Sequence, residues 1–226
     1  MSEVVQEEKK IQGQVWNIID QNRVLGFSDA VFAFAATLLV LKIDLPQEMR
    51  MQFTTNFSAV FTTLWPQYLA NIISFLVIGY YWLNHHAIFG LLKRFNATIV
   101  WMNLVFLIFL SFLPFPVDLF GDHPTIAGIV VFYSVSLSLV GFLLAIMWWY
   151  ASGKHRLIQK TMSSKERNYY LTRTLVAPCV FLLSAALVFI DTRVAQVSWI
   201  FVIIGILLVN KLFDIKHISE MDKNLL

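Results

Sequence analysis

Hydrophobic residues occur in six long blocks that are separated by short polar stretches. A helix needs about 20 consecutive, mostly apolar residues to cross the hydrocarbon core of a bilayer, and each block reaches about that length. The predicted spans cover about residues 24–44, 57–82, 97–120, 126–151, 171–190 and 196–213. Because these spans take up most of the chain, the pattern predicts an all-α membrane protein with a single six-helix transmembrane domain over residues 1–226.

The composition indicates the same class of protein. Hydrophobic residues make up 58% of the chain and charged residues only 14%, and the mean hydropathy is +0.68. A soluble domain of this size would need more polar surface. The segment before the first block lacks the positive-then-apolar order of a signal peptide, so we expect the first block to remain in the membrane as a helix.

The positive charges predict the orientation of the chain. With both termini in the cytoplasm, 14 of the 17 lysines and arginines lie on the cytoplasmic side, and only Lys42, Arg50 and Arg193 face outward. Membrane proteins collect these residues on the cytoplasmic side, so we expect a multi-pass protein of the plasma membrane with both termini cytoplasmic. The pI near 9.0 then reflects topology, and no nucleic-acid partner is expected.

The first block, "RVLGFSDAVFAFAATLLVLKIDLP" (23–46), carries two stripes at helical spacing. The large stripe consists of Phe27, Val31, Phe34, Leu38 and Leu41. The small stripe consists of Gly26, Ala30, Ala33 and Thr37. Small residues let helix backbones approach closely in lipid, so we expect the small stripe to be a packing face. The large stripe could face lipid, protein or a pore.

Ser28 and Asp29 belong to neither stripe. A carboxylate in a membrane span is costly unless it is paired or hydrated. Candidate partners are Asn84, His85 and His86 in "YYWLNHHAIF" (80–89), which the alternating topology places at the same depth. Adjacent histidines point about 100° apart on a helix, so we expect hydrogen bonding to the Ser28–Asp29 pair and no metal site. Such a network would hold the first helix in its packing position.

These motifs carry a family resemblance. The first block, with Arg23 followed by Phe27, Ser28 and Asp29, resembles the first-helix signature of the lysosomal potassium channel family, transmembrane protein 175. The segment "YYWLNHHAIF" resembles the second-helix segment of that family. The resemblance implies a potassium-preferring cation channel with one six-helix unit per chain. It further implies a homotetramer with the first helix lining a central pore, potassium ions as the permeant species, and no bound cofactor.

The resemblance also implies a role for individual residues. Matching the motif places a hydrophobic constriction at Phe34, Leu38 and Leu41, and Thr37 could add a ring of hydroxyl groups. Phe34 stands where the family usually has isoleucine or leucine. The residues expected to tie each first helix to its scaffold are Arg23, Phe27, Ser28, Asp29, His85 and His86. A filter of the "TVGYG" type does not occur in the sequence, which is consistent with the hydrophobic constriction that the resemblance implies.

Two other classes remain open on the residues alone. A small secondary transporter, coupled to an ion or proton gradient, would need broken helices or a charge pair at the membrane midplane. The spans contain Asn71, Asn103 and Ser184 at such depths but no deep acidic residue. An intramembrane enzyme using Asp29 with His85 or His86 would lack a second carboxylate or a metal-ligand spacing, so no enzyme activity is expected.

Overall fold

The computed structural model describes residues 21–41 and 57–213 of the chain, and every described element is helical apart from loops and one isolated bridge. The helices are α2 (Gln21–Leu41), α4 (Phe57–Gly90), α5 (Ala97–Phe112), α6 (Pro114–Asp122), α7 (Ala127–Ser152), η1 (Gly153–His155), α8 (Ser164–Leu187), α9 (Thr192–Val197) and α10 (Ile200–Leu212).

Six stretches of these helices are long and apolar enough to cross a membrane, which confirms the prediction of an all-α chain with six apolar spans. The helices α5 and α6 together make the third span, and α9 and α10 together make the sixth. The helix of the fifth span, α8, begins at Ser164, earlier than the hydrophobic pattern predicts, because Ser163 and Glu166 form a reciprocal capping box there. The second helix runs on to Gly90, beyond the expected end near residue 82.

Prolines act differently in the second and third spans. In the sequence, Pro114 and Pro116 predict a kink or an end of the third helix. The structure has this break, since α5 ends at Phe112 and Pro114 opens α6, where its missing N–H is not needed. Pro66 likewise predicts an early interruption of the second span, and this prediction was wrong, because α4 continues through it. A proline removes one helical hydrogen bond, and transmembrane helices tolerate this loss where side chains or neighbouring helices satisfy the freed group.

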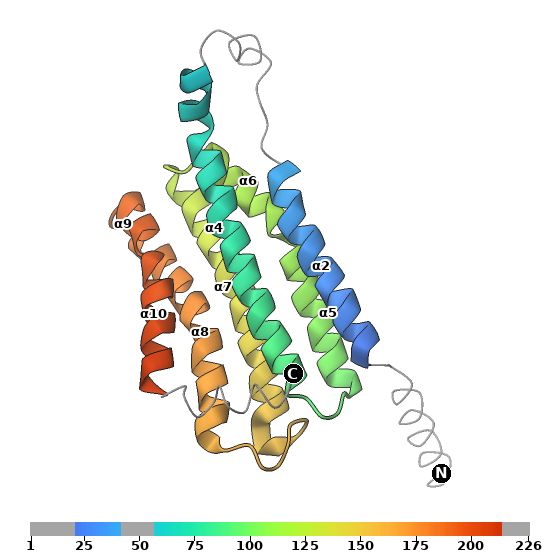
Figure 1. Cartoon of the computed structure of the whole chain (residues 1–226). Coiled ribbons are helices and arrows are strands. Elements are labelled where there is room, and N and C mark those ends of the chain that lie inside the picture. Colours follow the sequence, from blue (N-terminus) through green and yellow to red (C-terminus); the bar gives the residue numbers. More distant parts are fainter. Residues whose placement is uncertain (1–20, 42–56, 214–226) are drawn as a thin grey trace, which may run out of the picture.

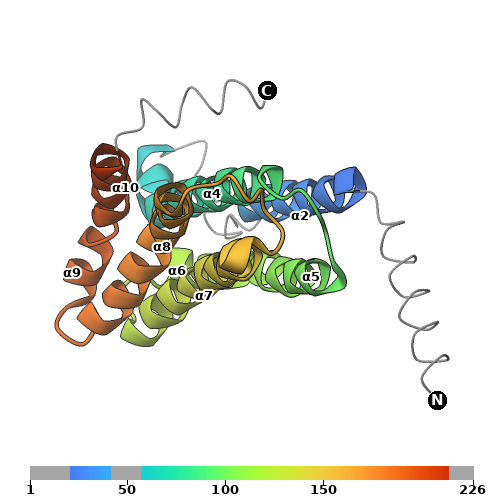
Figure 2. The same ribbon diagram turned by 90° about the horizontal axis from the view of Figure 1, so that it is seen from below.

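The helices run alternately up and down along one long axis, as Figure 1 shows. In the view from below, α2 and α10 lie at opposite edges of the bundle (Figure 2). The helix α7 packs along α8 and also contacts α4, α5 and α6. Its fully buried side chains include Tyr133, Leu137 and Trp148. The interior of the chain is therefore filled by large side chains centred on α7.

Hydrogen bonds between helices supplement this packing. The hydroxyls of Ser74 and Tyr133 lie 3.0 Å apart, and Tyr81 donates to the carbonyl of Leu137 at 2.8 Å. A Cβ at Gly141 would come within 2.9 Å of the ring of Pro178, so only glycine allows α7 and α8 to approach this closely. Close backbone contact and buried polar pairs are the main sources of helix association in lipid.

The two ends of the bundle differ in charge. One end contains the start of α2, the end of α4 and the α7–α8 loop (Figure 1). Most of the described lysines and arginines lie at this basic end: Arg23, Lys93, Arg94, Lys154, Arg156, Lys160, Lys165, Arg167, Arg173 and Lys211. Arg193 lies at the opposite end, together with Asp118, Asp122 and Asp191.

Candidate functional site

The helix α2 docks on the rest of the chain through a single face. Its buried residues are Ser28, Phe32, Ala35 and Leu39, whose spacing of four, three and four places them on one side of a helix. This face contacts α4, α5 and α6. The remaining surface of α2 lies at the edge of the bundle, as the blue ribbon in Figures 1 and 2 shows.

The large stripe of α2 lies largely outside the packing of the chain. Phe34 is 60% exposed and Leu41 is 78% exposed, whereas Leu38 is partly covered. Phe27 is exposed too, and Val31 is partly covered. An apolar row that its own chain leaves open must face lipid, another chain or a pore.

The small stripe lies on the opposite side from the docked face. Gly26, Ala30, Ala33 and Thr37 are exposed, and a Cβ added at Gly26 would meet no other atom within 4 Å. The stripe is therefore not buried against the described part of the chain, and its expected role as a packing face stays a prediction. The Thr37 hydroxyl donates to the carbonyl of Ala33 at 2.9 Å, so its oxygen remains on the exposed side while its proton is satisfied.

A buried polar chain joins three helices behind this exposed surface. Ser28 is fully buried, donates to the carbonyl of Val24 at 2.9 Å and accepts from Nδ2 of Asn103 at 2.9 Å. The other amide atom, Oδ1 of Asn103, lies 2.9 Å from Nε2 of His85. Because an amide oxygen only accepts, Nε2 of His85 donates this hydrogen bond. Ser28, Asn103 and His85 thus connect α2, α5 and α4.

Aromatic rings enclose the histidine of this network. The ring of His85 stacks on Phe89 with centroids 4.1 Å apart and on Phe106 at 5.6 Å, and Phe32 of α2 meets it edge-on at 5.4 Å. Its Nδ1 is buried and has no hydrogen-bond partner among the described residues. The network and its aromatic cover therefore fix one rotational position of α2 against α4 and α5.

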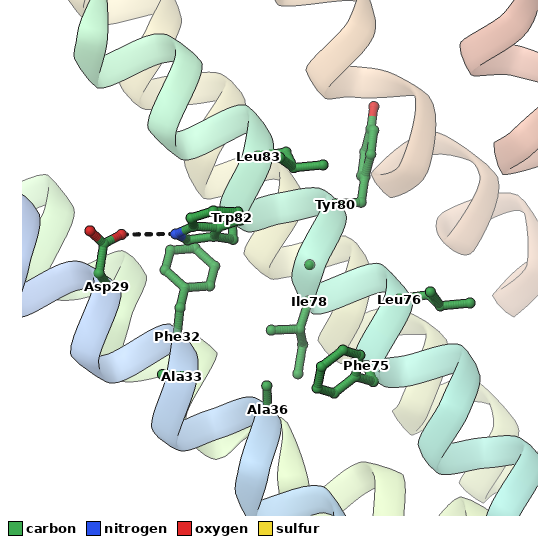
Figure 3. Close-up of a pocket in the computed structure, with 11 residues that line it drawn as sticks. Asp29, Phe32, Ala33, Ala36, Phe75, Leu76, Ile78, Tyr80, Trp82 and Leu83 are labelled. Atoms are coloured by element: carbon green, nitrogen blue, oxygen red, sulfur yellow. Dashed lines mark hydrogen bonds between the residues drawn. The ribbon is translucent and has the colours of Figure 1, made fainter.

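Asp29 makes a separate contact at the surface. Its carboxylate accepts from Nε1 of Trp82 at 2.8 Å (Figure 3). The Trp82 ring lies beside the ring of His86, with centroids 5.9 Å apart. The aspartate therefore bonds to a tryptophan of α4, not to a histidine as the sequence suggested. This contact closes one end of a groove of about 710 Å³ between α2 and α4. Ala33 and Ala36 of α2 face Phe75 and Ile78 of α4 across it (Figure 3).

Comparison with known proteins identifies the family. The sequence model of the protein family described as endosomal/lysosomal potassium channel TMEM175 matches residues 23–114. A potassium channel of Chamaesiphon minutus is 32% identical over 175 residues, which cover 76% of this chain and 86% of that channel. The chain belongs to the TMEM175 family. Its family relatives are named as channels, and it is a multi-pass membrane protein of a channel family and not an enzyme.

Further relatives extend the comparison. A crystal structure of a lysosomal potassium-selective channel TMEM175 homolog from Chamaesiphon minutus matches the fold with a TM-score of 0.71 and 29% identity, covering 84% of this chain and 98% of that one. An endosomal/lysosomal proton channel TMEM175 of Rattus norvegicus is 33% identical over 101 residues, which are 42% of this chain and 20% of the rat protein. Potassium and proton channels are thus both named among the TMEM175 relatives.

The residues singled out in this TMEM175-family chain do not form one network. Ser28 and His85 are joined through Asn103, and Asp29 and His86 are joined through Trp82. Arg23 and Phe27 are exposed, and neither makes a hydrogen bond or ring contact with another described residue. Asn84 donates to the carbonyl of Tyr80 in its own helix. No group of three metal-ligating side chains occurs within residues 21–41 and 57–213.

Asn103 is the functional position that the motif analysis did not connect to the network. The signal available in the sequence was a lone amide in the middle of an apolar span. Such an amide must find a polar partner in lipid, but the sequence does not say which helix supplies it.

Proposed function

We propose that this chain is a potassium-preferring cation channel whose conduction path forms between copies of the chain, along the exposed side of α2. Membership of the TMEM175 family supports the ion-conducting activity. The main observation that supports a conduction path along α2 is its open apolar stripe, in which Phe34 is 60% and Leu41 is 78% exposed. Potassium is the permeant ion in this proposal, and no cofactor takes part.

The path lies between chains because the interior of one chain is occupied. Tyr81, Phe106 and Tyr133 are fully buried where α4, α5 and α7 meet. Four copies arranged around an axis would bring four α2 helices together, each presenting its large stripe. The small stripe lies about a quarter-turn away around the helix. In a tetramer it would face a neighbouring copy, where small residues favour close helix contact.

Three apolar layers form the constriction in this arrangement. Phe34 and Leu41 lie seven residues apart, which is about 10 Å along a helix, and Leu38 lies between them. Rings of such side chains control permeation by excluding water from a narrow path. Thr37 would add hydroxyl oxygens next to the Leu38 layer. Ser28, Asn103 and His85 take no part in conduction and hold α2 in position.

The charge distribution of the ends supports the orientation. Among the described residues, lysines and arginines concentrate at the end where α2 begins, and Arg193 lies at the other end. Under the positive-inside rule the basic end is cytoplasmic. We therefore place both termini in the cytoplasm and the protein in the plasma membrane.

Ion flux from liposomes tests this function directly. The purified full-length protein is reconstituted with outward gradients of potassium, sodium or protons, and a protonophore is added where the voltage must be short-circuited. We expect downhill potassium flux that needs no second ion and exceeds sodium flux. Flux that depends on a coupled ion gradient would favour a secondary transporter instead. Proton flux equal to or above potassium flux would contradict the potassium preference.

A further inference from the structure

A second groove runs between α4 and the α8–α10 side of the bundle. It has a volume of about 650 Å³ and differs from the α2–α4 groove of Figure 3. Its lining is apolar over most of its length, with Ile73 and Val77 from α4, Phe181 from α8, and Ile203 and Ile206 from α10. Ile203 is 62% exposed, so the groove opens on the surface that lipid chains would contact.

The basic end of this groove is closed by polar side chains from the same three helices. Tyr80 lines the groove and points away from α2 (Figure 3), and its hydroxyl donates to the carbonyl of Arg173 in α8. Asn210 lies one turn beyond Ile206 on α10 and accepts from the Tyr169 hydroxyl at 3.2 Å. Arg173 lies two turns before Phe181 on α8, and its guanidinium reaches the Tyr169 hydroxyl at this closed end.

The charge of Arg173 is not compensated by the part of the chain that the structure describes. Its Nη1 is 3.5 Å from the neutral Tyr169 hydroxyl, and its Nε is buried without a hydrogen-bond partner. No carboxylate within residues 21–41 and 57–213 pairs with it. Lys211 adds a second positive charge at the same end of α10. A cation at the edge of a membrane span is costly unless an anion or water approaches it.

We propose that this groove and Arg173 form a binding site for an anionic phospholipid of the leaflet at the basic end. The guanidinium binds the phosphate, to which its planar donors are matched in geometry. One acyl chain fills the apolar groove between α4 and α10. Two positive charges at the headgroup position favour a lipid of net negative charge over a zwitterionic lipid, whose own cation they would repel.

Native mass spectrometry of the delipidated full-length protein tests the site. Phosphatidylglycerol and phosphatidylcholine with the same acyl chains are titrated onto the wild type and onto Arg173→Gln. We expect the wild type to bind the first phosphatidylglycerol more tightly than phosphatidylcholine. Arg173→Gln should weaken phosphatidylglycerol binding about tenfold, as loss of a charge-assisted contact does, and weaken phosphatidylcholine binding less, so that the preference for phosphatidylglycerol falls. Equal phosphatidylglycerol binding by the two proteins would overturn the proposal.

Three further variants separate charge, groove and fold. Arg193→Gln removes an arginine from the opposite end and should change the binding of neither lipid. Ile203→Trp fills the groove from its exposed wall and should weaken both lipids. Arg173→Lys keeps the charge and should retain most of the preference for phosphatidylglycerol. If Arg173→Gln does not yield folded protein, the test rests on Ile203→Trp. Lipid affinities of this variant equal to those of the wild type would overturn the site, and weaker binding of both lipids would support it.

The C-terminal segment, which carries three acidic side chains and two lysines, is the competing occupant. Asp214, Glu220 and Asp222 lie outside the described residues. A variant that ends at Phe213 lacks all three carboxylates. The proposal expects this variant to prefer phosphatidylglycerol as the wild type does. A preference seen only after the truncation would mean that the segment itself covers Arg173, and it would overturn the lipid site in the intact chain.

Discussion

The docked side and the open side of α2 differ in the interactions that their side chains make. Its docked side is positioned by directional contacts, because Ser28 bonds to Asn103 and Phe32 packs against the ring of His85. The large stripe on its open side, with Phe34 and Leu41, consists of apolar side chains. In lipid an apolar side chain gains little by being buried in protein, so polar pairs and close packing decide which way a helix faces. The comparison therefore predicts that the docked side controls stability and the open side controls permeation.

Replacing Asn103 with leucine should have the largest effect. The change leaves Nε2 of His85 without its acceptor and removes the donor to Ser28. A buried group left unsatisfied costs about 1–3 kcal/mol, so we expect a clear fall in the thermal unfolding temperature of the detergent-purified protein. Asn71→Leu serves as the control, because within the part of the chain that the structure describes the Asn71 side chain donates only to its own helix. Equal falls in unfolding temperature for Asn103→Leu and Asn71→Leu would contradict a stabilising role of the Ser28–Asn103–His85 network.

Shortening Leu38 to alanine should act on permeation and leave the fold intact. Widening an apolar constriction lowers the cost of hydrated passage, and we expect sodium flux to rise about tenfold, equivalent to a barrier lower by about 1.4 kcal/mol. Val40→Ala is the matched control, since Val40 is 62% exposed and lies on the flank of α2 away from the large stripe. A similar rise in sodium flux for both variants would mean that the stripe does not define the path.

The contact between Asp29 and Trp82 should contribute less, because both side chains are exposed. We expect Asp29→Asn and Trp82→Phe each to reduce stability by about 1 kcal/mol or less. A double-mutant cycle on thermal unfolding and on the yield of assembled protein measures their coupling. If the effects of the two substitutions on stability and yield are strictly additive, the contact between Asp29 and Trp82 does not stabilise the docking of α2 on α4.

Thr37→Val should have the smallest effect on stability. Among the described residues, the Thr37 hydroxyl bonds only to carbonyls of its own helix, at 2.9 and 3.0 Å, so we expect the stability of the bundle not to depend on it. In the proposed pore the change removes a ring of oxygen atoms beside Leu38. We expect an unchanged unfolding temperature and a reduced ratio of potassium to sodium flux. A large loss of stability would place Thr37 in a contact that the single chain does not contain.

The sequence predicted the helical class and the number of apolar spans, because the length of a hydrophobic block directly reports its ability to cross a bilayer. It also predicted the break at Pro114. It did not predict the continuous helix through Pro66 or the early start at Ser164, which depend on how neighbouring groups satisfy the backbone.

The candidate site was predictable only in part. A costly carboxylate and histidines at one depth indicated a polar network, but the order of its contacts depends on which helices are neighbours. Asn103 comes from α5, far along the chain from Ser28, and Trp82 takes the place expected for a histidine beside Asp29. The small stripe was expected to be a packing face, but periodicity shows which residues share a face and not whether that face meets its own chain or another one.

Chemical modification of single cysteines tests most directly whether the open stripe of α2 faces the ion path. Cys179, the one native cysteine, is first replaced by serine, and Leu41→Cys and Val40→Cys are then made in that background. Both positions are exposed in the single chain. Liposome potassium flux is measured before and after treatment with a water-soluble cationic thiol reagent. Our account predicts a block of flux in Leu41→Cys and unchanged flux in Val40→Cys, whereas block in Val40→Cys alone, or in neither, would contradict it.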